Sequence, residues 1–291
     1  MDECTSASIY NINCTEYKYA NVGDDIYWRI IRTNHDGSIR LLYSGTSPDT
    51  TKGTIGMNDF NTTYKDPMYL GYMYGTSGSL ENNRANTNNS IIKGVIDTWY
   101  KDNLNTNYGK YISTTAIYCN DRELEPGQKY STSSAFNYAP YYRMDYDKGG
   151  AKANPSYNCT DIRDAFSGSN SEAKLTYPIG LMTADEIAYA GGKALTSLTS
   201  PYAWYYLNSA GGSITGSTYW WLMSPFRYDG YFSMGSIVDG STDGTGTLNG
   251  HILLYADGVR PAISLKTCTL WTSGNGTPET PYEIVETDTG C

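Results

Sequence analysis

The segment Ile179-Gly-Leu-Met-Thr-Ala-Asp-Glu-Ile-Ala-Tyr-Ala-Gly191 carries the clearest local signature in the chain. Thr183, followed three positions later by Glu186, fits a capping box, in which the Thr side chain accepts from the third amide and the Glu reaches back. We therefore expect a short helix over residues 187–190. Gly191-Gly192 ends it, because glycine tolerates the left-handed backbone of a helix terminus.

Downstream of this segment the chain shows short strand patterns separated by glycines. Strands are predicted over residues 219–223, 230–239, 250–255 and 258–265, and Asp257-Gly258 predicts a tight turn. Tyr219-Trp220-Trp221 has two interpretations, a stacking platform for a sugar or a buried strand. The apolar run continues through Leu222-Met223, which favours the strand.

Upstream, the apolar runs 26–31 and 39–43 flank Asn34-His35-Asp36-Gly37, and Asp-Gly between such runs predicts a β-hairpin. After a polar loop, apolar residues recur at helical spacing from Ile91 to Leu104, with Ser90 as the expected N-cap. Few helices and many late strands predict one α+β domain over residues 1–291. Residues 268–291, rich in Pro, Gly and Thr, are interpreted as a linker-like tail.

The composition excludes several classes of protein. With 18% charged and 14% aromatic residues the chain is neither a disordered tail nor a coiled coil. Thirty acidic residues against 21 basic ones argue against a nucleic-acid partner. The longest apolar runs fall short of the roughly 18 residues that a membrane span needs, so no direct membrane insertion is expected.

Cysteine usage points to an oxidising compartment. The six cysteines are Cys4, Cys14, Cys119, Cys159, Cys268 and Cys291. They form no Cys-x-x-Cys pair, and their even number suits three disulfides. Sequential pairing (4–14, 119–159, 268–291) closes the shortest loops and is our expectation, with free buried cysteines as the alternative. We expect an extracellular or cell-surface protein whose targeting segment is absent from this sequence, because the N-terminus lacks the basic and apolar stretches of a signal peptide.

Motifs for catalysis and cofactor binding are sparse. The two histidines, His35 and His251, have no recognisable partner spacing, and Gly-x-Ser-x-Gly, Walker A and His-Glu-x-x-His patterns are missing from the sequence. We therefore predict no enzyme and no cofactor. Asp239, Ser241 and Asp243 followed by Gly244 copy the start of a calcium-binding EF-hand loop, but Gly250 stands where its Glu is required. Calcium stays an open alternative to a plain glycine-rich turn.

Residues 226–257, which we call the window, have the composition of a binding region. From Tyr228 to Gly258 there are four Asp and seven Gly but no Lys or Arg, together with several aromatic side chains. Aromatic residues give a large contact area at low entropic cost, and Ser and Gly give adaptable contacts. The alternative is a β-meander whose tyrosines cover their own core.

Three segments in order, Ile179–Gly191, Trp220–Pro225 and Gly258–Leu265, with Asn86–Tyr100 upstream, carry a family resemblance. Together they resemble bacterial and phage surface proteins with a C-type-lectin-like domain of the formylglycine-generating-enzyme type, which include the variable proteins of diversity-generating retroelements. The resemblance implies a C-type-lectin-like fold that binds a ligand through the window. The implied ligand-facing residues are Arg227, Tyr228, Asp229, Tyr231, Ser233, Ser236, Asp239, Asn249, His251 and Tyr255.

The chain departs from two members of this group. The Glu-Pro-Asn, Gln-Pro-Asp and Trp-Asn-Asp motifs of sugar-binding lectins are missing, and the catalytic cysteine pair of the enzymes has no counterpart inside the window. The leading hypothesis is a receptor or adhesin that binds a protein or glycan on another cell or phage host. The alternatives are a structural surface or pilus-tip module with a fixed partner and, third, an enzyme. On the leading hypothesis, replacing Tyr228 and Tyr231 with Ala leaves the melting temperature nearly unchanged.

Overall fold

The structure, a computed structural model, describes residues 25–48, 53–196, 219–239 and 246–291. Within these ranges the chain mixes α and β structure, with few helices, many short antiparallel strands and long loops. The predicted mixed, loop-rich and mainly antiparallel architecture is therefore confirmed. The described helices are short, and none has the length and apolar character that crossing a bilayer requires.

The elements have the following bounds. The strands are β1 Trp28–Thr33, β2 Ile39–Tyr43, β3 Gly56–Asn58, β4 Met73–Tyr74, β5 Asn88–Asn89, β6 Tyr118–Cys119, β7 Phe136–Asn137, β8 Ala165–Phe166, β9 Gly180–Leu181, β10 Lys193–Ala194, β11 Tyr219–Tyr228, β12 Ser233–Asp239, β13 Thr247–Ile252, β14 Asp257–Val259, β15 Pro261–Leu265, β16 Trp271–Ser273 and β17 Glu283–Ile284. The α-helices are α1 Leu80–Asn83, α2 Ile91–Asn103, α3 Ala139–Arg143 and α4 Ala184–Tyr189. Short 3-10 helices are η1 Pro67–Leu70, η2 Gly109–Tyr111, η3 Tyr146–Lys148, η4 Ile162–Asp164 and η5 Ser171–Ala173.

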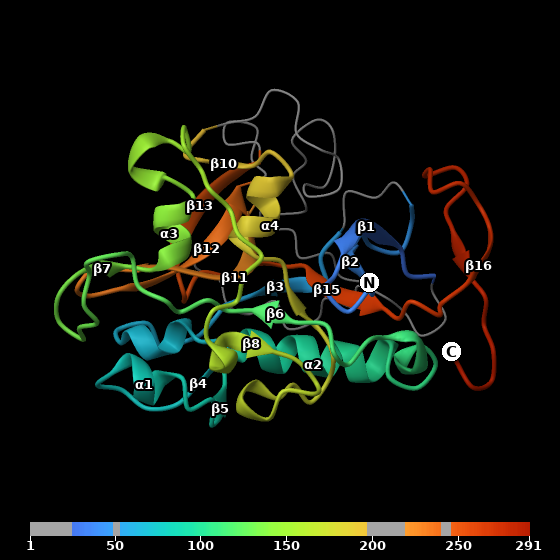
Figure 1. Cartoon of the computed structure of the whole chain (residues 1–291), viewed down its shortest axis with the longest axis horizontal. Helices are drawn as coiled ribbons and strands as arrows, with labels where there is room; N and C mark the ends of the chain where they lie inside the picture. The colour runs from blue at the N-terminus through green and yellow to red at the C-terminus, as the bar shows by residue number, and fades with distance from the viewer. Residues whose placement is uncertain (1–24, 49–52, 197–218, 240–245) are drawn as a thin grey trace, which may run out of the picture.

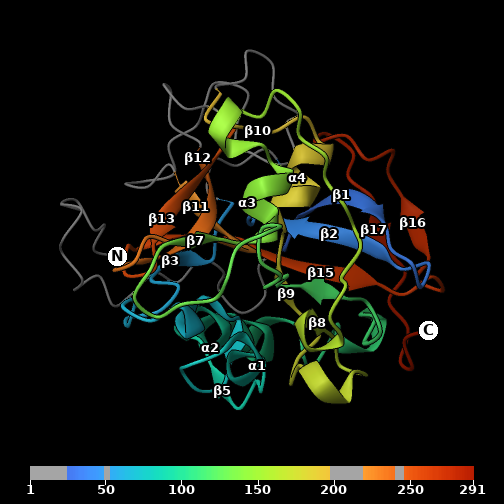
Figure 2. The ribbon, with the colours of Figure 1, turned by 60° about the vertical axis from the view of Figure 1, so that its left-hand side comes forward.

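Two sheets form the centre of the molecule. One has the strand order β1-β2-β15-β9, and the other has the order β10-β13-β12-β11-β14-β3, with β7 added against β11. Figures 1 and 2 show α2 on one side of these strands and α3 with α4 on the other. Side chains from both sheets and from α2 share one hydrophobic core, in which Trp220 and Trp221 are at most 1% exposed.

The locally encoded elements form where the sequence predicts them. The β1–β2 hairpin turns at Gly37, whose φ of +80° suits glycine, and the Asn34 amide donates to the Ser38 carbonyl at 2.8 Å. Ser90 caps α2 by accepting from the Lys93 amide at 3.3 Å. Each of these signals needs only residues close in sequence, so no tertiary information is required to recognise it.

The capping box at Thr183 is also confirmed. Thr183 Oγ1 accepts from the Glu186 amide at 3.1 Å, and Glu186 Oε2 accepts from the Thr183 amide at 2.9 Å. The helix α4 begins at Ala184, three residues before the predicted start. Thr183 is the N-cap, so the first turn of the helix consists of residues 184–186, which the prediction had left outside it.

Two sequence interpretations around β11 are settled by burial and pairing. Trp220 and Trp221 are buried, so the Tyr-Trp-Trp stretch is a core strand and not a sugar platform. The turn predicted at Asp257-Gly258 is wrong, because both residues lie in β14, where Gly258 pairs with Trp220 in parallel. A Cβ on Gly258 would stand 2.9 Å from the Tyr219 carbonyl oxygen, so glycine here permits a close strand approach.

The long strand β11 is irregular at its middle. Its register with β12 shifts between Trp221 and Pro225 and again between Pro225 and Arg227. Proline has no amide hydrogen for a ladder and is tolerated at such irregular positions. The downstream half of β11, from Phe226, therefore pairs with β12 in a register that starts anew after Pro225.

The C-terminal segment 268–291, interpreted from sequence as a linker-like tail, folds back on itself. Strands β16 and β17 form a hairpin, and the Cys268–Cys291 disulfide closes the segment with the two Cα atoms 5.5 Å apart. The carbonyl of Thr287 accepts hydrogen bonds from Lys110 and Tyr111, which hold the segment against η2. Its final strand over 282–285 is confirmed in β17.

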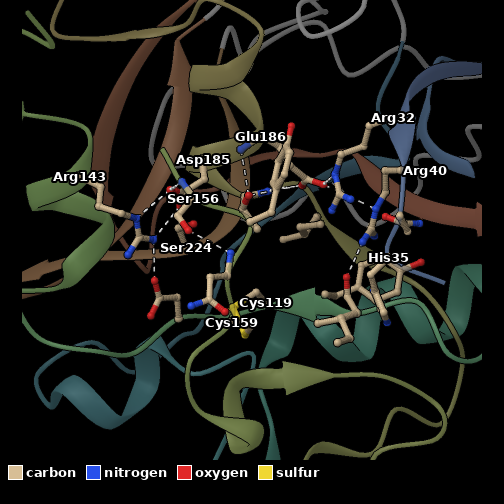
Figure 3. A pocket seen from close by; sticks show the side chains of 18 of the residues that line it. Arg32, His35, Arg40, Cys119, Arg143, Ser156, Cys159, Asp185, Glu186 and Ser224 are labelled. Atoms are coloured by element: carbon tan, nitrogen blue, oxygen red, sulfur yellow. Dashed lines mark hydrogen bonds and ion pairs between the residues drawn. A yellow bond between two sulfur atoms is a disulfide. The ribbon is translucent and has the colours of Figure 1, made fainter. Parts of the chain in front are cut away.

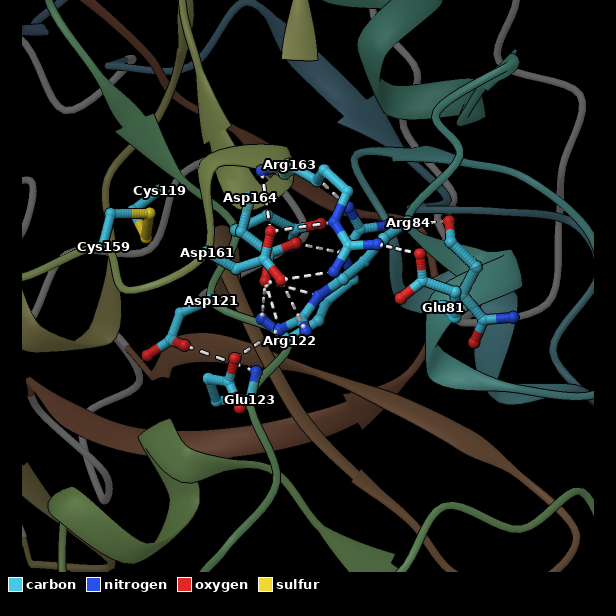
Figure 4. A network of polar contacts seen from close by, with 12 residues as sticks. Glu81, Arg84, Cys119, Asp121, Arg122, Glu123, Cys159, Asp161, Arg163 and Asp164 are labelled. Carbon is cyan, nitrogen blue, oxygen red and sulfur yellow. Dashed lines mark hydrogen bonds and ion pairs between the residues drawn. A yellow bond between two sulfur atoms is a disulfide. The ribbon is translucent and has the colours of Figure 1, made fainter. Parts of the chain in front are cut away.

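Buried charges order the loop-rich middle of the chain (Figure 4). The carboxylate of Asp164 accepts from Arg122 Nε at 2.6 Å and from Arg84 Nη2 at 2.7 Å. Asp164 and Arg122 are each 1% exposed, and Arg84 is 5% exposed. Further Arg122 N–H groups donate to the carbonyls of Met73 and Asn83. This cluster joins three loops far apart in sequence and satisfies their backbone carbonyls.

Candidate functional site

The described residues of the window, 226–239 and 246–257, contribute the downstream half of β11 with β12 and β13, three neighbouring antiparallel strands of the larger sheet. The downstream half of β11 pairs with β12, and β12 pairs with β13 over six consecutive residue pairs from Met234–Ile252 to Asp239–Thr247. The backbone turn between β11 and β12 is held by Asp229, whose Oδ1 accepts from the amides of Tyr231 and Phe232 at 2.9 and 2.6 Å. Gly230 has a φ of +95° in this turn. The loop tip is therefore fixed by its own polar side chain.

Four of the ten predicted ligand-facing residues are buried, and their assignment is corrected. Tyr228, Ser233 and Ser236 are at most 2% exposed, and Asp239 is 9% exposed. The Tyr228 hydroxyl donates to the Thr132 carbonyl at 3.0 Å, and Ser233 Oγ donates to the Asp66 carbonyl at 2.9 Å. Strands β11 and β12 are both buried along nearly their whole length, so alternation does not bring half of their side chains to the surface.

The other six predicted residues reach solvent, and we call them the window surface. They are Arg227, Asp229, Tyr231, Asn249, His251 and Tyr255. Tyr231 and Tyr255 are the most prominent, with 54% and 38% of their area exposed. Both stand beyond the same end of the β12–β13 ladder, because the Leu253 amide donates to the Ser233 carbonyl at 3.2 Å. Asn249 and His251 point to the same side of β13, being two residues apart.

An aromatic group supports Tyr231. Its ring stands edge-on to Phe232 with centroids 4.5 Å apart, and Phe232 stacks on Tyr64 at 5.5 Å. Lys65 Nζ lies 5.0 Å from the Tyr231 ring centroid, a cation–π contact. The exposed ring is thus held by neighbours from residues 64–65, which the sequence did not connect with the window.

His251 is the centre of a second group. Its Nδ1 shares a hydrogen bond of 2.9 Å with Asp257 Oδ2, and its ring stands edge-on to Tyr219 and Tyr255 at centroid distances of 4.5 and 5.4 Å. Burial raises the pKa of Asp257, while the hydrogen bond with His251 opposes that rise. A ring tied to a carboxylate and flanked by tyrosines presents a fixed polar edge between apolar faces, which suits ligand recognition.

Asp59 belongs to the same group and carries a perturbed carboxyl. Its partial burial and, second, the nearby charge of Asp257 raise its pKa to about 6. The folded state therefore holds a proton that the unfolded chain releases near its ordinary value of 3.8, so stability falls as the pH rises through this interval.

We expect Asp59→Asn to stabilise the protein relative to wild type increasingly as the pH rises from about 4 to about 6, with no further gain above that. The measurement is the difference between the two melting temperatures at each pH. If the amide side chain itself changes the melting temperature, it does so equally at every pH, so the pH dependence of the difference is unaffected. A difference that does not change with pH would show that Asp59 titrates normally.

The structure describes two of the three predicted disulfides but only one of the three calcium candidates. Of the weak calcium candidates, Asp239 is described, whereas Ser241 and Asp243 lie outside the described residues. In the described part of the chain no group of three or more His, Cys, Asp or Glu side chains is arranged to hold a metal ion. The predicted pairs Cys119–Cys159 and Cys268–Cys291 are both formed, and Cys4 and Cys14 lie outside the described residues.

Comparison with known proteins gives no relative: no family model, no curated protein and no solved structure matches the chain.

The sequence did not predict several members of the site. Asp257 had a local signal but was assigned to a turn, and Tyr219 was considered only within the Tyr-Trp-Trp stretch, as a sugar-stacking platform or a buried strand. Asp59, Tyr64 and Lys65 carried no signal, because only the fold brings them to the window.

Proposed function

We propose that this chain is a non-enzymatic, extracellular ligand-binding protein, a receptor or adhesin, and that the window surface is its binding face. The observation that carries the proposal is the exposure of Tyr231 and Tyr255, at 54% and 38%, beyond the same end of the β12–β13 ladder, whose residues are buried or only partly exposed. The two disulfides are compatible with an extracellular protein.

The physical basis is a rigid frame with adaptable contacts. Backbone hydrogen bonds of β11, β12 and β13, not the exposed side chains, hold the frame. Large aromatic side chains that are already held by neighbours lose little entropy on binding, and tyrosine is enriched among residues that dominate binding energy. Tyr231 against Phe232 and Tyr255 against His251 meet this condition.

The finer proposal is a C-type-lectin-like fold of the formylglycine-generating-enzyme type that serves as a variable protein of a diversity-generating retroelement. Its support is the motif resemblance together with the separation of the window into a buried frame and six exposed positions. Substitutions at the most exposed of these positions, Tyr231 and Tyr255, cost less stability than substitutions in the buried frame. The ligand would be a protein or glycan on another cell or phage host, with no role for nucleic acid.

The test is binding of the whole chain to an array of immobilised glycans and to a panel of intact bacterial cells. We expect Tyr231→Ala combined with Tyr255→Ala to weaken binding to any responding probe by at least about tenfold, given what aromatic anchors contribute to interfaces. Tyr142→Ala is the matched control, because Tyr142 is also exposed, at 56%, but lies on α3. Undiminished binding by the double variant would exclude the window surface as the binding face.

A second candidate function is a structural surface or pilus-tip module with a fixed partner. It is favoured by the C-terminal hairpin, where Leu270, Trp271 and Tyr282 are 64%, 65% and 45% exposed. Loss of binding in Trp271→Ser, but not in the double tyrosine variant, would select this function. The enzymatic alternative is weaker, because Cys268 and Cys291 pair with each other and close this hairpin.

A further inference from the structure

A cleft separate from the window surface lies between the β1–β2 hairpin, the N-terminus of α4 and the Cys119–Cys159 disulfide (Figure 3). Its volume is about 470 Å³, within the range of sites for small molecules. None of the six residues of the window surface lines it. Its walls instead carry three arginines and three carboxylates, and the positive and negative charges are unequally divided between its two ends.

One end of the cleft has an excess of positive charge. Arg32 and Arg40 share the single carboxylate of Glu186, with Nε to Oε1 distances of 2.8 and 3.6 Å. The second oxygen of Glu186 is committed to the capping box, where it accepts from the Thr183 amide. Two guanidinium groups therefore face one carboxylate at this end.

The other end has the opposite imbalance. Asp121 and Asp185 share the single guanidinium of Arg143, with Arg143 Nη2 2.6 Å from Asp121 and Nε 2.8 Å from Asp185. Both carboxylates are buried. Asp121 also has a φ of +27°, a conformation that costs a non-glycine residue energy and concentrates at functional sites. Figure 3 shows Arg143 on one side and Arg32 with Arg40 on the other, with Asp185 and Glu186 between them.

Unpartnered polar atoms on the cleft wall point to a missing ligand group. Arg40 is 1% exposed; its Nη2 donates to the Ile117 carbonyl, but its Nη1 has no hydrogen-bond partner. Asn34, 7% exposed on the same wall, has an unpartnered Oδ1. A buried donor and acceptor left unpaired cost free energy that a complementary ligand would recover.

We propose that this cleft binds a short zwitterion of the amino-acid or dipeptide class, its carboxylate at Arg40 and Arg32 and its ammonium at Asp121 and Asp185, beside the Arg143 guanidinium that they share. The ligand is short because the cleft has a volume of only about 470 Å³ and because Asp185 and Glu186, which belong to opposite ends, are neighbours in α4. The rings of Tyr118 and Tyr157, stacked against Arg40 and Arg32 at 4.0 and 4.4 Å, fix the two guanidinium planes.

The test is isothermal titration calorimetry of the whole chain with glycine and diglycine, and with acetate and methylammonium as single-charge probes. We expect diglycine or glycine to bind at least about tenfold more tightly than either single-charge probe, since each charged end contributes its own hydrogen bonds. Acetate binding as tightly as both zwitterions would show a simple anion site, and methylammonium doing so a simple cation site. Either result, or no heat with any probe, overturns the proposal.

Two variants test the assigned ends. Arg32→Gln and Asp121→Asn should each weaken binding of the zwitterion by about tenfold or more. Arg32 is the safer variant for folding, because its side chain is 21% exposed. Arg29→Gln is the matched control, since Arg29 lies on the same strand, donates to Ser44 and does not line the cleft. Equal affinity in Arg32→Gln and Arg29→Gln would overturn the assignment.

Discussion

Replacing Asp164 with Ala is expected to lower the free energy of unfolding by about 3–5 kcal/mol, the loss typical when one partner of a buried ion pair is removed. Asp164 accepts from Arg122 Nε, from the Arg122 amide and from Arg84 Nη2 at 2.6 to 2.8 Å. Without it, two guanidinium groups stay buried and lose their shared carboxylate. Urea denaturation of wild type and variant measures the difference.

Glu81→Ala is the matched control for this prediction. Glu81 also pairs with an arginine, Arg163, but its side chain is 76% exposed, so solvent screens the pair. We expect its loss to leave the urea midpoint of unfolding nearly unchanged. If the two variants were equally stable, the cluster around Asp164 would contribute no more than a surface pair.

Tyr228→Ala is expected to cost about 3–5 kcal/mol of unfolding free energy, as removal of a buried aromatic side chain does. Tyr228 is 2% exposed, and its ring packs 5.9 Å from that of Phe136. Its single hydroxyl hydrogen faces two carbonyl acceptors, Thr132 at 3.0 Å and Lys65 at 3.3 Å. This expectation reverses the sequence-based one, in which Tyr228 was a replaceable surface residue.

Tyr231, three residues along the chain, provides the internal comparison. It is 54% exposed, so Tyr231→Ala removes only its contacts with Phe232 and Lys65 and should lower the free energy of unfolding by no more than about 1–2 kcal/mol. Thermal and urea unfolding of both single variants would separate the two roles. Similar stability of the two variants would contradict the division of the window into frame and surface.

The parts of the fold that the sequence predicts are those with a local physical cause. Asp36-Gly37 fixes a hairpin because Gly37 accepts a positive φ, and Thr183 with Glu186 fixes a helix start through their own hydrogen bonds. Each involves residues within a few positions of one another. Cysteine pairing was also predictable where the shortest loop is the true one, as in Cys119–Cys159.

The window was predicted only in part, because alternation fails where a strand is covered on both sides. Phe136 of β7 pairs with Tyr228 and lies far from it in sequence, so nothing near Tyr228 signals its burial. Asp257 was misassigned for a similar reason. An Asp-Gly dipeptide is typical of turns, and only its partner strands β3 and β11 show that it lies in a ladder.

The sequence analysis did not predict the buried arginines and carboxylates. The arginines and carboxylates of the cleft come from β1, β2, α3, α4 and the loop at Asp121, and charged residues at such spacings ordinarily predict solvated surface. Their burial depends on tertiary pairing that no local pattern encodes. For the same reason, the imbalance of two arginines to one carboxylate at Glu186 can be recognised only from the fold, which brings Arg32 and Arg40 together there.

The irregular register at Pro225 has a consequence for how the window can vary between related chains. After Pro225, β11 pairs with β12 in a single register. Substitutions there replace a side chain but leave each position on the same face of the strand. Inserting or deleting a single residue within the strands would exchange the two faces of the positions beyond it, so Tyr228 would lose its packing against Phe136. Length variation is therefore tolerable at the turn around Gly230, whereas the strands themselves can change only in side-chain identity.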